Sequence, residues 1–215
     1  MNRKNIKLVV FDLDGTLVDA YAAVTDSLNT AFKKLKLPQS DYQTVKRSVG
    51  WGEQALVKTL APKESVEEVL QIYRDCHKRI LRKKVKVLPG VKDLLRDLKK
   101  EGLKLSVASN RPTEFTCFIL KILKIDLFFD LVLCADKVKH PKPFPDLLLE
   151  TAKFFRLKSS QVLYVGDMII DVQTGQRAKV KTIAVATGSN TKNELASVKP
   201  YQLIDDILRV KDFIN

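Results

Sequence analysis

The feature that most constrains the fold is a series of short apolar runs that alternate with segments of helical periodicity. The first run, at residues 6–11, is rich in β-branched residues and ends at an acidic turn that contains a glycine. Similar runs follow along the chain at residues 103–108, 131–134, 162–165 and 182–185, with a weaker one near 201–204. Continuous apolar runs of this length are typical of strands that are buried on both faces of a parallel sheet.

The segments between these runs carry apolar residues at helical spacing. Residues 91–98 place four aliphatic side chains on one face of a predicted helix, and Gly102 follows its end. Further apolar stripes lie within residues 118–123 and 147–155. Because strands alternate with helices, we predict a Rossmann-like, doubly wound α/β core with a mostly parallel sheet.

One segment, residues 18–88, breaks this alternation. We find no run in it that predicts a strand, and we expect helices instead, at about residues 20–35, 42–49, 53–60 and 66–81. We therefore predict a core formed by residues 1–17 and 89–215 and an inserted helical cap formed by residues 18–88. The cap would close over the core through hinges near both of its junctions.

Composition limits the expected partners. The net charge of +13 suits an anionic partner, but aromatic residues are not interleaved with the basic runs, so we expect no nucleic acid. No apolar run approaches the ~18 residues of a membrane span, and we expect no membrane partner. The scattered cysteines Cys76, Cys117 and Cys134 lack zinc or redox spacing, which favours the cytoplasm and buried thiols.

Ligands of an open α/β sheet bind beyond the carboxyl ends of its strands, so the polar residues near those ends form the candidate site. These residues are, in chain order, Asp12 and Asp14, then Ser109, Asn110 and Arg111, then Lys142, and finally Asp167 and Asp171. Buried strands rarely end in so many acids unless a cation neutralises them. Oxygen ligands without histidine or cysteine indicate Mg²⁺ rather than zinc.

This set of residues resembles the haloacid dehalogenase superfamily of phosphotransferases over nearly the whole chain. The sequence Asp-Leu-Asp-Gly-Thr at residues 12–16 matches the first family motif, Ser109 the second, Lys142 the third, and Gly-Asp-x-x-x-Asp at residues 166–171 the fourth. The helical insert between the first two motifs corresponds to the family's type 1 cap. The Leu-Pro-Gly-Val return at residues 88–91 looks most like the phosphoglycolate phosphatase and β-phosphoglucomutase branch.

The resemblance implies a Mg²⁺-dependent phosphatase that works through an aspartyl-phosphate intermediate. Asp12 would be the nucleophile. Asp14 would be the general acid that protonates the leaving alcohol and then the base that activates water. Ser109 and Lys142 would bind the transferred phosphoryl group.

The resemblance also implies the ligands of the metal ion. Mg²⁺ would be held by the carboxylates of Asp12 and Asp167 and by the backbone carbonyl of Asp14. Asp171 would act directly or through water. The bound ion would offset the repulsion among these carboxylates.

Further substrate contacts are predicted next to the second motif and in the cap. Asn110 would orient the phosphate, and Arg111 would pair with either the substrate or a surface carboxylate. In the cap, Gly50, Trp51 and a second glycine interrupt the helical pattern. This loop would either face the site and set specificity, because glycine lets a substrate approach the backbone, or form a turn with Trp51 packed inside the helical bundle.

Other side chains leave alternatives open. Lys137 and Lys139 are alternatives to Lys142, although the prolines that follow Lys142 stiffen its segment. Arg47 would either bind a substrate carboxylate or lie on an exposed helix face. His77 lies within a predicted cap helix and is expected to face solvent.

The expected activity is hydrolysis of a small organic phosphate monoester, with 2-phosphoglycolate as the best single substrate. The alternatives are a phosphosugar mutase of the β-phosphoglucomutase type and a pyrophosphatase or nucleotidase on the same core. A dehalogenase is disfavoured, because Asp14 would then have no role. The remote alternative is a binding protein without catalytic activity.

Overall fold

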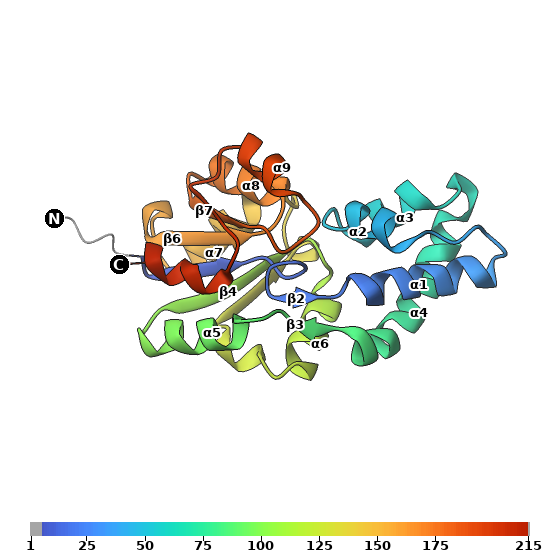
Figure 1. The fold of residues 1–215 in the computed structure, drawn as a ribbon, viewed down its shortest axis with the longest axis horizontal. Helices are drawn as coiled ribbons and strands as arrows, with labels where there is room; N and C mark the ends of the chain where they lie inside the picture. The colour runs from blue at the N-terminus through green and yellow to red at the C-terminus, as the bar shows by residue number, and fades with distance from the viewer. Residues whose placement is uncertain (1–5, 215) are drawn as a thin grey trace.

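Six parallel strands form the main sheet of the computed structural model, which describes residues 6–214 (Figure 1). The strands lie in the order β5-β4-β1-β6-β7-β8. Their bounds are Leu8–Phe11 for β1, Lys104–Ser109 for β4, Leu131–Cys134 for β5, Val162–Gly166 for β6, Lys181–Val185 for β7 and Gln202–Ile204 for β8. The predicted strands and the doubly wound α/β class are confirmed, with β1 in the middle of the sheet.

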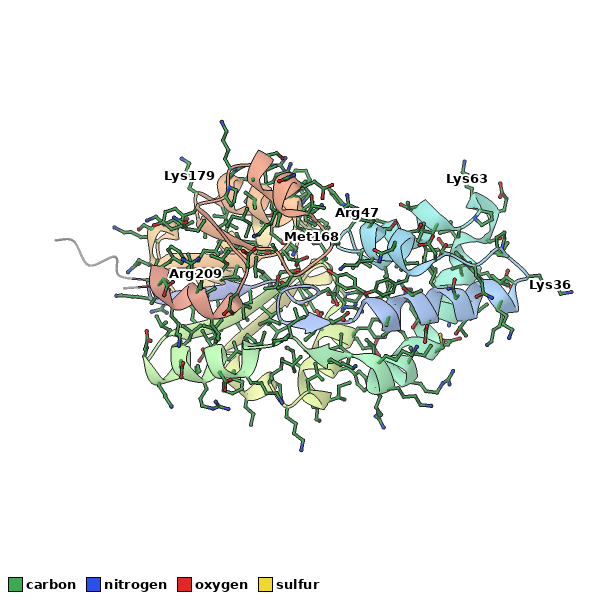
Figure 2. All side chains as sticks on the ribbon, in the orientation of Figure 1. Lys36, Arg47, Lys63, Met168, Lys179 and Arg209 are labelled. Carbon is green, nitrogen blue, oxygen red and sulfur yellow. The ribbon has the colours of Figure 1, made fainter. Side chains whose placement is uncertain are left out.

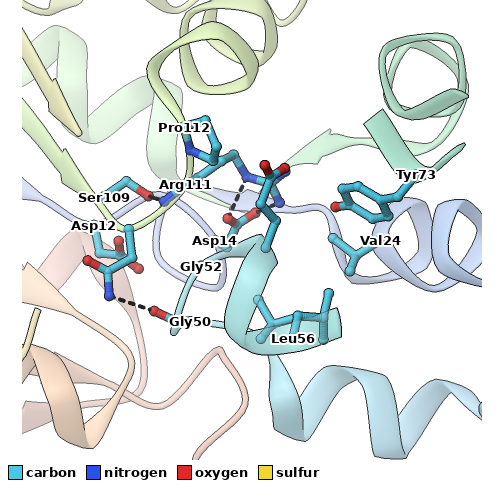
Figure 3. A pocket seen from close by; sticks show the side chains of 13 residues that line it. Asp12, Asp14, Val24, Gly50, Gly52, Leu56, Tyr73, Ser109, Arg111 and Pro112 are labelled. Atoms are coloured by element: carbon cyan, nitrogen blue, oxygen red, sulfur yellow. Dashed lines mark hydrogen bonds and ion pairs between the residues drawn. The ribbon is translucent and has the colours of Figure 1, made fainter. Parts of the chain in front are cut away.

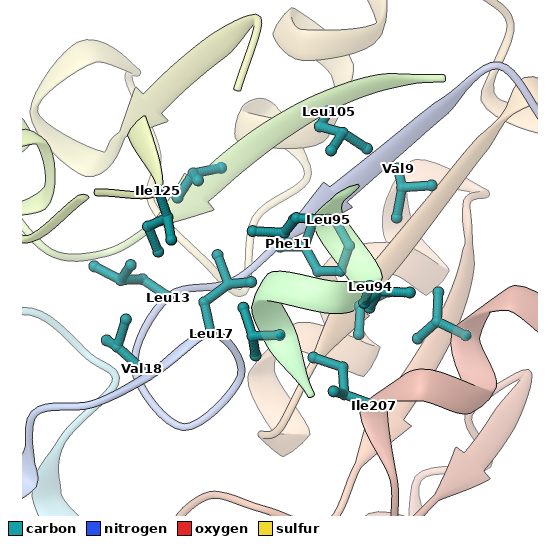
Figure 4. Close-up of a cluster of buried hydrophobic side chains, with 14 of the residues drawn as sticks. Val9, Phe11, Leu13, Leu17, Val18, Leu94, Leu95, Leu105, Ile125 and Ile207 are labelled. Atoms are coloured by element: carbon teal, nitrogen blue, oxygen red, sulfur yellow. The ribbon is translucent and has the colours of Figure 1, made fainter. Parts of the chain in front are cut away.

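Helices cover both faces of this sheet, which is why its strands are apolar on both sides. Val9 and Phe11 of β1 pack on one face in a cluster with α5, α6 and the 3₁₀ helix η5 (Figure 4). Leu8 and Val10 pack on the other face with α7 and α8. The bounds are Val91–Lys100 for α5, Thr113–Ile122 for α6, Asp146–Phe154 for α7, Ile169–Ala178 for α8, Lys192–Ser197 for α9 and Ile207–Phe213 for η5.

A second group of helices lies beside the sheet, on the right of Figure 1. Their bounds are Tyr21–Lys34 for α1, Tyr42–Ser48 for α2, Glu53–Leu60 for α3 and Val66–Lys84 for α4. These four helices share an apolar cluster of their own, which includes Leu28, Phe32 and Val69. Short 3₁₀ turns occupy Lys63–Ser65, Asp126–Phe128, Ala135–Lys137 and Ser159–Gln161.

The connections between the sheet and helices α1–α4 correct one expectation. β2 (Val18–Asp19) and β3 (Lys86–Val87) pair as antiparallel strands, with Val18 opposite Val87, so the prediction that residues 18–88 contain no strand is wrong. Two residues are too few to show strand periodicity. The strands form because the chain leaves and re-enters the core at neighbouring places, which a local pattern does not report.

The cysteines correct a second expectation. Cys76 and Cys134 are buried, but Cys117 is exposed on α6, so the prediction of buried thiols is wrong for Cys117. Its position follows directly after the buried Phe115 and Thr116, so the helix turns it away from the sheet. Within residues 6–214, no helix has the length and apolar character needed to cross a membrane.

Candidate active site

The candidate site lies where three neighbouring strands end. β4, β1 and β6 are adjacent and parallel, so their carboxyl ends meet at one edge of the sheet. Ser109 is the last residue of β4, whereas Asp12 and Asp167 directly follow β1 and β6. All three side chains are buried. The strand order therefore brings together residues that are far apart in the sequence.

Three buried carboxylates gather at this edge. Asp12, Asp167 and Asp171 each place one oxygen within 4.8 Å of the others. Burial, although opposed by Lys142, raises the pKa of Asp12 to about 7. Burial and the charges of Asp12 and Asp171 raise the pKa of Asp167 well above its usual range. A cation would relieve this repulsion, and a hard set of carboxylate oxygens fits Mg²⁺.

Lys142 is the ammonium group that faces these carboxylates. Its Nζ donates to Asp12 Oδ1 at 2.6 Å, to Asp171 Oδ1 at 2.7 Å and to the hydroxyl of Tyr164 at 3.2 Å. Burial lowers the pKa of Lys142, but the two carboxylates outweigh burial and raise it above its usual value. The alternatives Lys137 and Lys139 are exposed, so Lys142 is the lysine that the fold places at the site.

Asp171 and Asp167 are held by different partners. Asp171 Oδ1 accepts hydrogen bonds from Tyr164 and Lys142, and its Oδ2 accepts one from the backbone N–H of Met168. Asp167 Oδ1 accepts one from the Thr16 hydroxyl at 2.9 Å, and its Oδ2 accepts longer ones from the Tyr21 hydroxyl and the Ser189 N–H, all of them from uncharged donors. Asp167 therefore makes fewer charged contacts than Asp171, which leaves Asp167 the more available of the two for a metal ion.

Gly15 allows the loop after β1 to approach Asp167. Its φ of +87° lies in the left-handed region that favours glycine. A Cβ atom at this position would overlap both the Asp167 carboxylate and the Tyr21 hydroxyl. The Asp-x-Asp-Gly-Thr sequence thus combines two acids with the one residue type that lets them pack against the neighbouring strand end.

Asp14 does not join the carboxylate cluster, because its side chain is paired with Arg111. Arg111 donates from Nε to Asp14 Oδ2 at 2.8 Å and from Nη2 to Oδ1 at 3.0 Å. Both residues are buried. The prediction that Arg111 pairs with a surface carboxylate is therefore wrong, and the pairing leaves the backbone carbonyl of Asp14 as its available metal ligand.

His77 is a site residue that the sequence reasoning missed. Its side chain is fully buried, so the prediction that it faces solvent is wrong. Its Nε2 lies 2.7 Å from Arg111 Nη1, and guanidinium only donates, so Nε2 accepts and the proton sits on Nδ1, which faces Ser27 Oγ at 2.7 Å. The spacing of Leu70, Tyr73, His77 and Leu81 on α4 was the available signal, because it places His77 on the buried stripe.

The burial of His77 predicts a pH dependence of folding stability. Burial, with Arg111 nearby, lowers its pKa from 6.5 to about 2. Below pH 6.5 the unfolded chain gains a proton that folded His77 does not take up, so the unfolding free energy falls by about 1.4 kcal/mol per pH unit. When the pH is lowered from about 6.5 to 5, the unfolding free energy measured with urea should therefore fall by about 2 kcal/mol more in the wild type than in His77→Asn.

The matched control is His140→Asn, because His140 is the other histidine of the chain and is exposed. His140→Asn should retain the wild-type decrease in unfolding free energy. Equal decreases for His77→Asn and the wild type would contradict a neutral, buried His77.

Asn110 links Lys142 to the loop between α2 and α3. Its Nδ2 donates to the carbonyls of Lys142 and Gly50, each at 3.0 Å, and its Oδ1 accepts from Lys142 N–H at 2.9 Å. These contacts fix the backbone of Lys142 and bring the Gly50 loop onto the core. In this structure the amide of Asn110 is occupied by backbone groups. Its predicted role in orienting the phosphate stays a prediction.

A cavity lies between the strand ends and helices α1, α3 and α4 (Figure 3). The core side of its wall includes Asp12, Asp14, Ser109 and Arg111. Gly50 and Gly52 also line it, whereas Trp51 is 50 % exposed and is not among the described residues of the wall. The alternative with Trp51 packed inside the bundle is therefore wrong.

Arg47 fastens α2 to the core. It makes two hydrogen bonds with Glu194, at 2.5 and 2.9 Å, and a third with the carbonyl of Ser189 at 2.6 Å. Figure 2 shows Arg47 near Met168, where the helical part meets the core. The alternative that Arg47 lies on an exposed helix face is confirmed, since its side chain is 48 % exposed, and from there it contacts distant segments of the core. A contact with a substrate carboxylate stays a prediction.

Comparison with known proteins identifies the family of this chain. Residues 9–185 match the family model of the haloacid dehalogenase-like hydrolases. A phosphoglycolate phosphatase from Pseudomonas savastanoi pv. phaseolicola is 31 % identical over 213 residues, which are 95 % of this chain and 78 % of that protein. One from Psychrobacter arcticus is 27 % identical over 219 residues, which are 97 % of this chain and 95 % of that protein.

A solved structure with a similar fold agrees with this comparison. The crystal structure of a predicted phosphoglycolate phosphatase from Haemophilus somnus 129PT superposes with a TM-score of 0.93 at 26 % identity, covering 98 % of this chain and 99 % of that one. The family match includes the segments that carry Asp12, Ser109, Lys142 and Asp167. This chain belongs to the family of haloacid dehalogenase-like hydrolases.

Proposed function

We propose that this protein is a Mg²⁺-dependent phosphatase that hydrolyses a small organic phosphate monoester. The observation that carries the proposal is the position of Asp12. This buried carboxylate sits at the end of the central strand, 2.6 Å from Lys142 Nζ, and lines the cavity between the core and helices α1–α4. The names of the relatives make 2-phosphoglycolate the first reference substrate.

The proposed domain division is a core of residues 1–17 and 89–215 with a cap of residues 18–88. The separate apolar cluster of helices α1–α4 supports it, and so does the β2–β3 pair at the two crossings. In this division the Gly50 loop and Arg47 contact the core across the domain boundary. A closed cap would exclude water from the cavity and limit the size of the leaving group.

The residues present fit a Mg²⁺ ion. Asp12 and Asp167 would hold it with their carboxylates and Asp14 with its backbone carbonyl. Asp171, which already accepts a hydrogen bond from Lys142, would contact the ion through a water molecule. When bound, the ion would neutralise charge on the phosphoryl group. The burial that raises the pKa of Asp12 to about 7 is the cost that such an ion would relieve.

The side chains of this protein would divide the reaction into two steps. Asp12 attacks phosphorus and forms an acyl-phosphate bond as the P–O bond to the leaving alcohol breaks. Asp14 gives that alcohol its proton, and later takes one from the water that attacks the same phosphorus and releases Asp12. Lys142 and Ser109 would stabilise the charge of the phosphoryl group throughout.

The Arg111 contact bears on this mechanism. Each oxygen of Asp14 accepts one hydrogen bond from Arg111. Because a carboxylate oxygen has a second lone pair, Asp14 can meet the leaving alcohol while Arg111 still holds it in place. The cytoplasmic location expected from the cysteines stays a prediction.

The direct test is release of inorganic phosphate from a panel of small phosphate esters, with Mg²⁺ and with EDTA. We expect release with Mg²⁺ and a loss of at least about a hundredfold with EDTA, since a bound ion contributes several kcal/mol to a phosphoryl transition state. Isomerisation of glucose 1-phosphate without phosphate release would indicate a mutase instead. No release from any ester would contradict the proposal.

A further inference from the structure

The charges on the wall of the cavity bear on which ester this protein takes. The core side supplies Asp12, Asp14 and Arg111. Of the described residues that the helical part adds, Glu53 is the one with a charged side chain, next to apolar neighbours such as Val24 and Leu56. Glu53 is the first residue of α3 and follows the glycine-rich loop directly. If Asp12 and Lys142 hold the phosphoryl group, Glu53 would be left to meet the leaving group in the same cavity.

One oxygen of Glu53 lacks a partner. The side chain is only 9 % exposed, and its Oε1 accepts a hydrogen bond from Arg74 Nε at 2.6 Å. Its Oε2 is buried, and no group within residues 6–214 forms a hydrogen bond with it. A buried carboxylate oxygen without a donor is unfavourable, and native proteins rarely leave one unpaired. A group that enters the cavity with an O–H or N–H donor would satisfy it.

The cations near the cavity already have partners. Arg111, the cation among the described residues of the wall, donates twice to Asp14 and once to His77. Arg74 is engaged with Glu53. A leaving group with a carboxylate would therefore meet the charges of Glu53 and Asp14 without a free cation, whereas a donor group would meet an acceptor.

We infer that Glu53 selects a phosphate ester whose leaving group carries a hydrogen-bond donor, a hydroxyl or an ammonium group, and that it disfavours a carboxylate such as that of 2-phosphoglycolate. The inference rests on the proposed phosphatase activity and deepens it. Glu53 is thus a specificity residue whose Oε2 accepts the donor, and Arg74 is a positioning residue that holds Oε1.

The test compares kcat/KM for three esters: sn-glycerol 3-phosphate with hydroxyls, phosphoethanolamine with an ammonium group, and 2-phosphoglycolate with a carboxylate. The wild type should prefer one of the donor esters, and which one it prefers identifies the donor. In Glu53→Gln, kcat/KM for that ester relative to kcat/KM for 2-phosphoglycolate should fall at least about tenfold. The variant loses a charge-assisted hydrogen bond to the donor, and its amide can donate to a carboxylate.

Two further variants keep the test informative. Glu53→Asp retains the charge but withdraws it by one methylene, so it should lower kcat/KM for the donor ester without raising it for 2-phosphoglycolate. Glu67→Gln is the matched control, because Glu67 is an exposed acid on α4 outside the cavity wall, and it should leave all ratios unchanged. Circular dichroism of each variant checks its fold.

Hydrolysis of p-nitrophenyl phosphate, whose leaving group has no donor, separates the two proposals. It should be detectable with Mg²⁺ in the wild type and also in Glu53→Gln, whatever the rate in the variant. Wild-type preference for 2-phosphoglycolate, or equal changes for all three esters in Glu53→Gln, would overturn the role of Glu53 while hydrolysis of p-nitrophenyl phosphate persists. Absence of hydrolysis of every ester, this one included, would overturn the phosphatase proposal itself.

Discussion

Asp12→Asn is expected to lower the turnover of phosphate esters by at least about 10⁴-fold, the scale on which an enzyme loses activity with its nucleophile. An amide oxygen can still accept the hydrogen bond from Lys142 but does not form the acyl-phosphate bond. The fold should persist, because the change removes one of three crowded negative charges and leaves Asp171 to pair with Lys142. Phosphate release and thermal unfolding measure the two effects.

The control for this variant is Asp212→Asn. Asp212 is exposed and forms a surface ion pair with Arg209, at 3.4 Å, so the change should affect neither turnover nor unfolding appreciably. If Asp12→Asn keeps a tenth or more of the wild-type turnover, Asp12 is not the nucleophile.

Lys142→Met should have the largest effect on stability. Removing one partner of a buried ion pair leaves the other uncompensated, at a cost of about 3 kcal/mol or more. Asp12 and Asp171 would then lack their ammonium partner in a buried site. In metal-free buffer the loss should grow as the pH rises from about 4 toward 7, because burial raises the pKa of Asp12 from 3.8 to about 7 and the variant lacks the ammonium group that opposes this rise. Added Mg²⁺ should restore part of the stability.

Lys139→Met is the matched control, because Lys139 lies in the same segment and is exposed. It should unfold like the wild type in urea. Turnover should fall by about 10² or more in Lys142→Met alone, since a preorganised charge next to the phosphoryl group would be lost. Equal stability of the two variants without metal would contradict the electrostatic role assigned to Lys142.

The sheet could be predicted from the sequence because its signal is local. A strand buried on both faces must be apolar throughout, so the runs at residues 6–11 and 162–165 indicate strands without knowledge of their neighbours. Helices such as 53–60 were likewise predictable from their periodicity. The two-residue strands β2 and β3 were not, because each forms only by pairing with the other, and that pairing leaves no local pattern in the sequence.

Several residues in and around the candidate site were harder to find. His77 and Glu53 look like ordinary polar residues of surface helices, and their burial depends on which helix packs above them. Arg47 has a partner in Glu194, at a distance of 147 residues along the chain, that no local pattern indicates. For Trp51 the sequence left two alternatives open, and only its half-exposed side chain in the structure excludes the one inside the helical bundle.

The sequence by itself determined the order of strands and helices, the family, and the set of acids and the lysine that follow the strands. It did so because apolar periodicity and short motifs depend on residues close together in the chain. Only the tertiary structure decided which charges neutralise one another: Lys142 with Asp12 and Asp171, Arg111 with Asp14, and Glu53 with a single partner. Electrostatic energy depends on distance and burial, and both arise only when remote segments pack together.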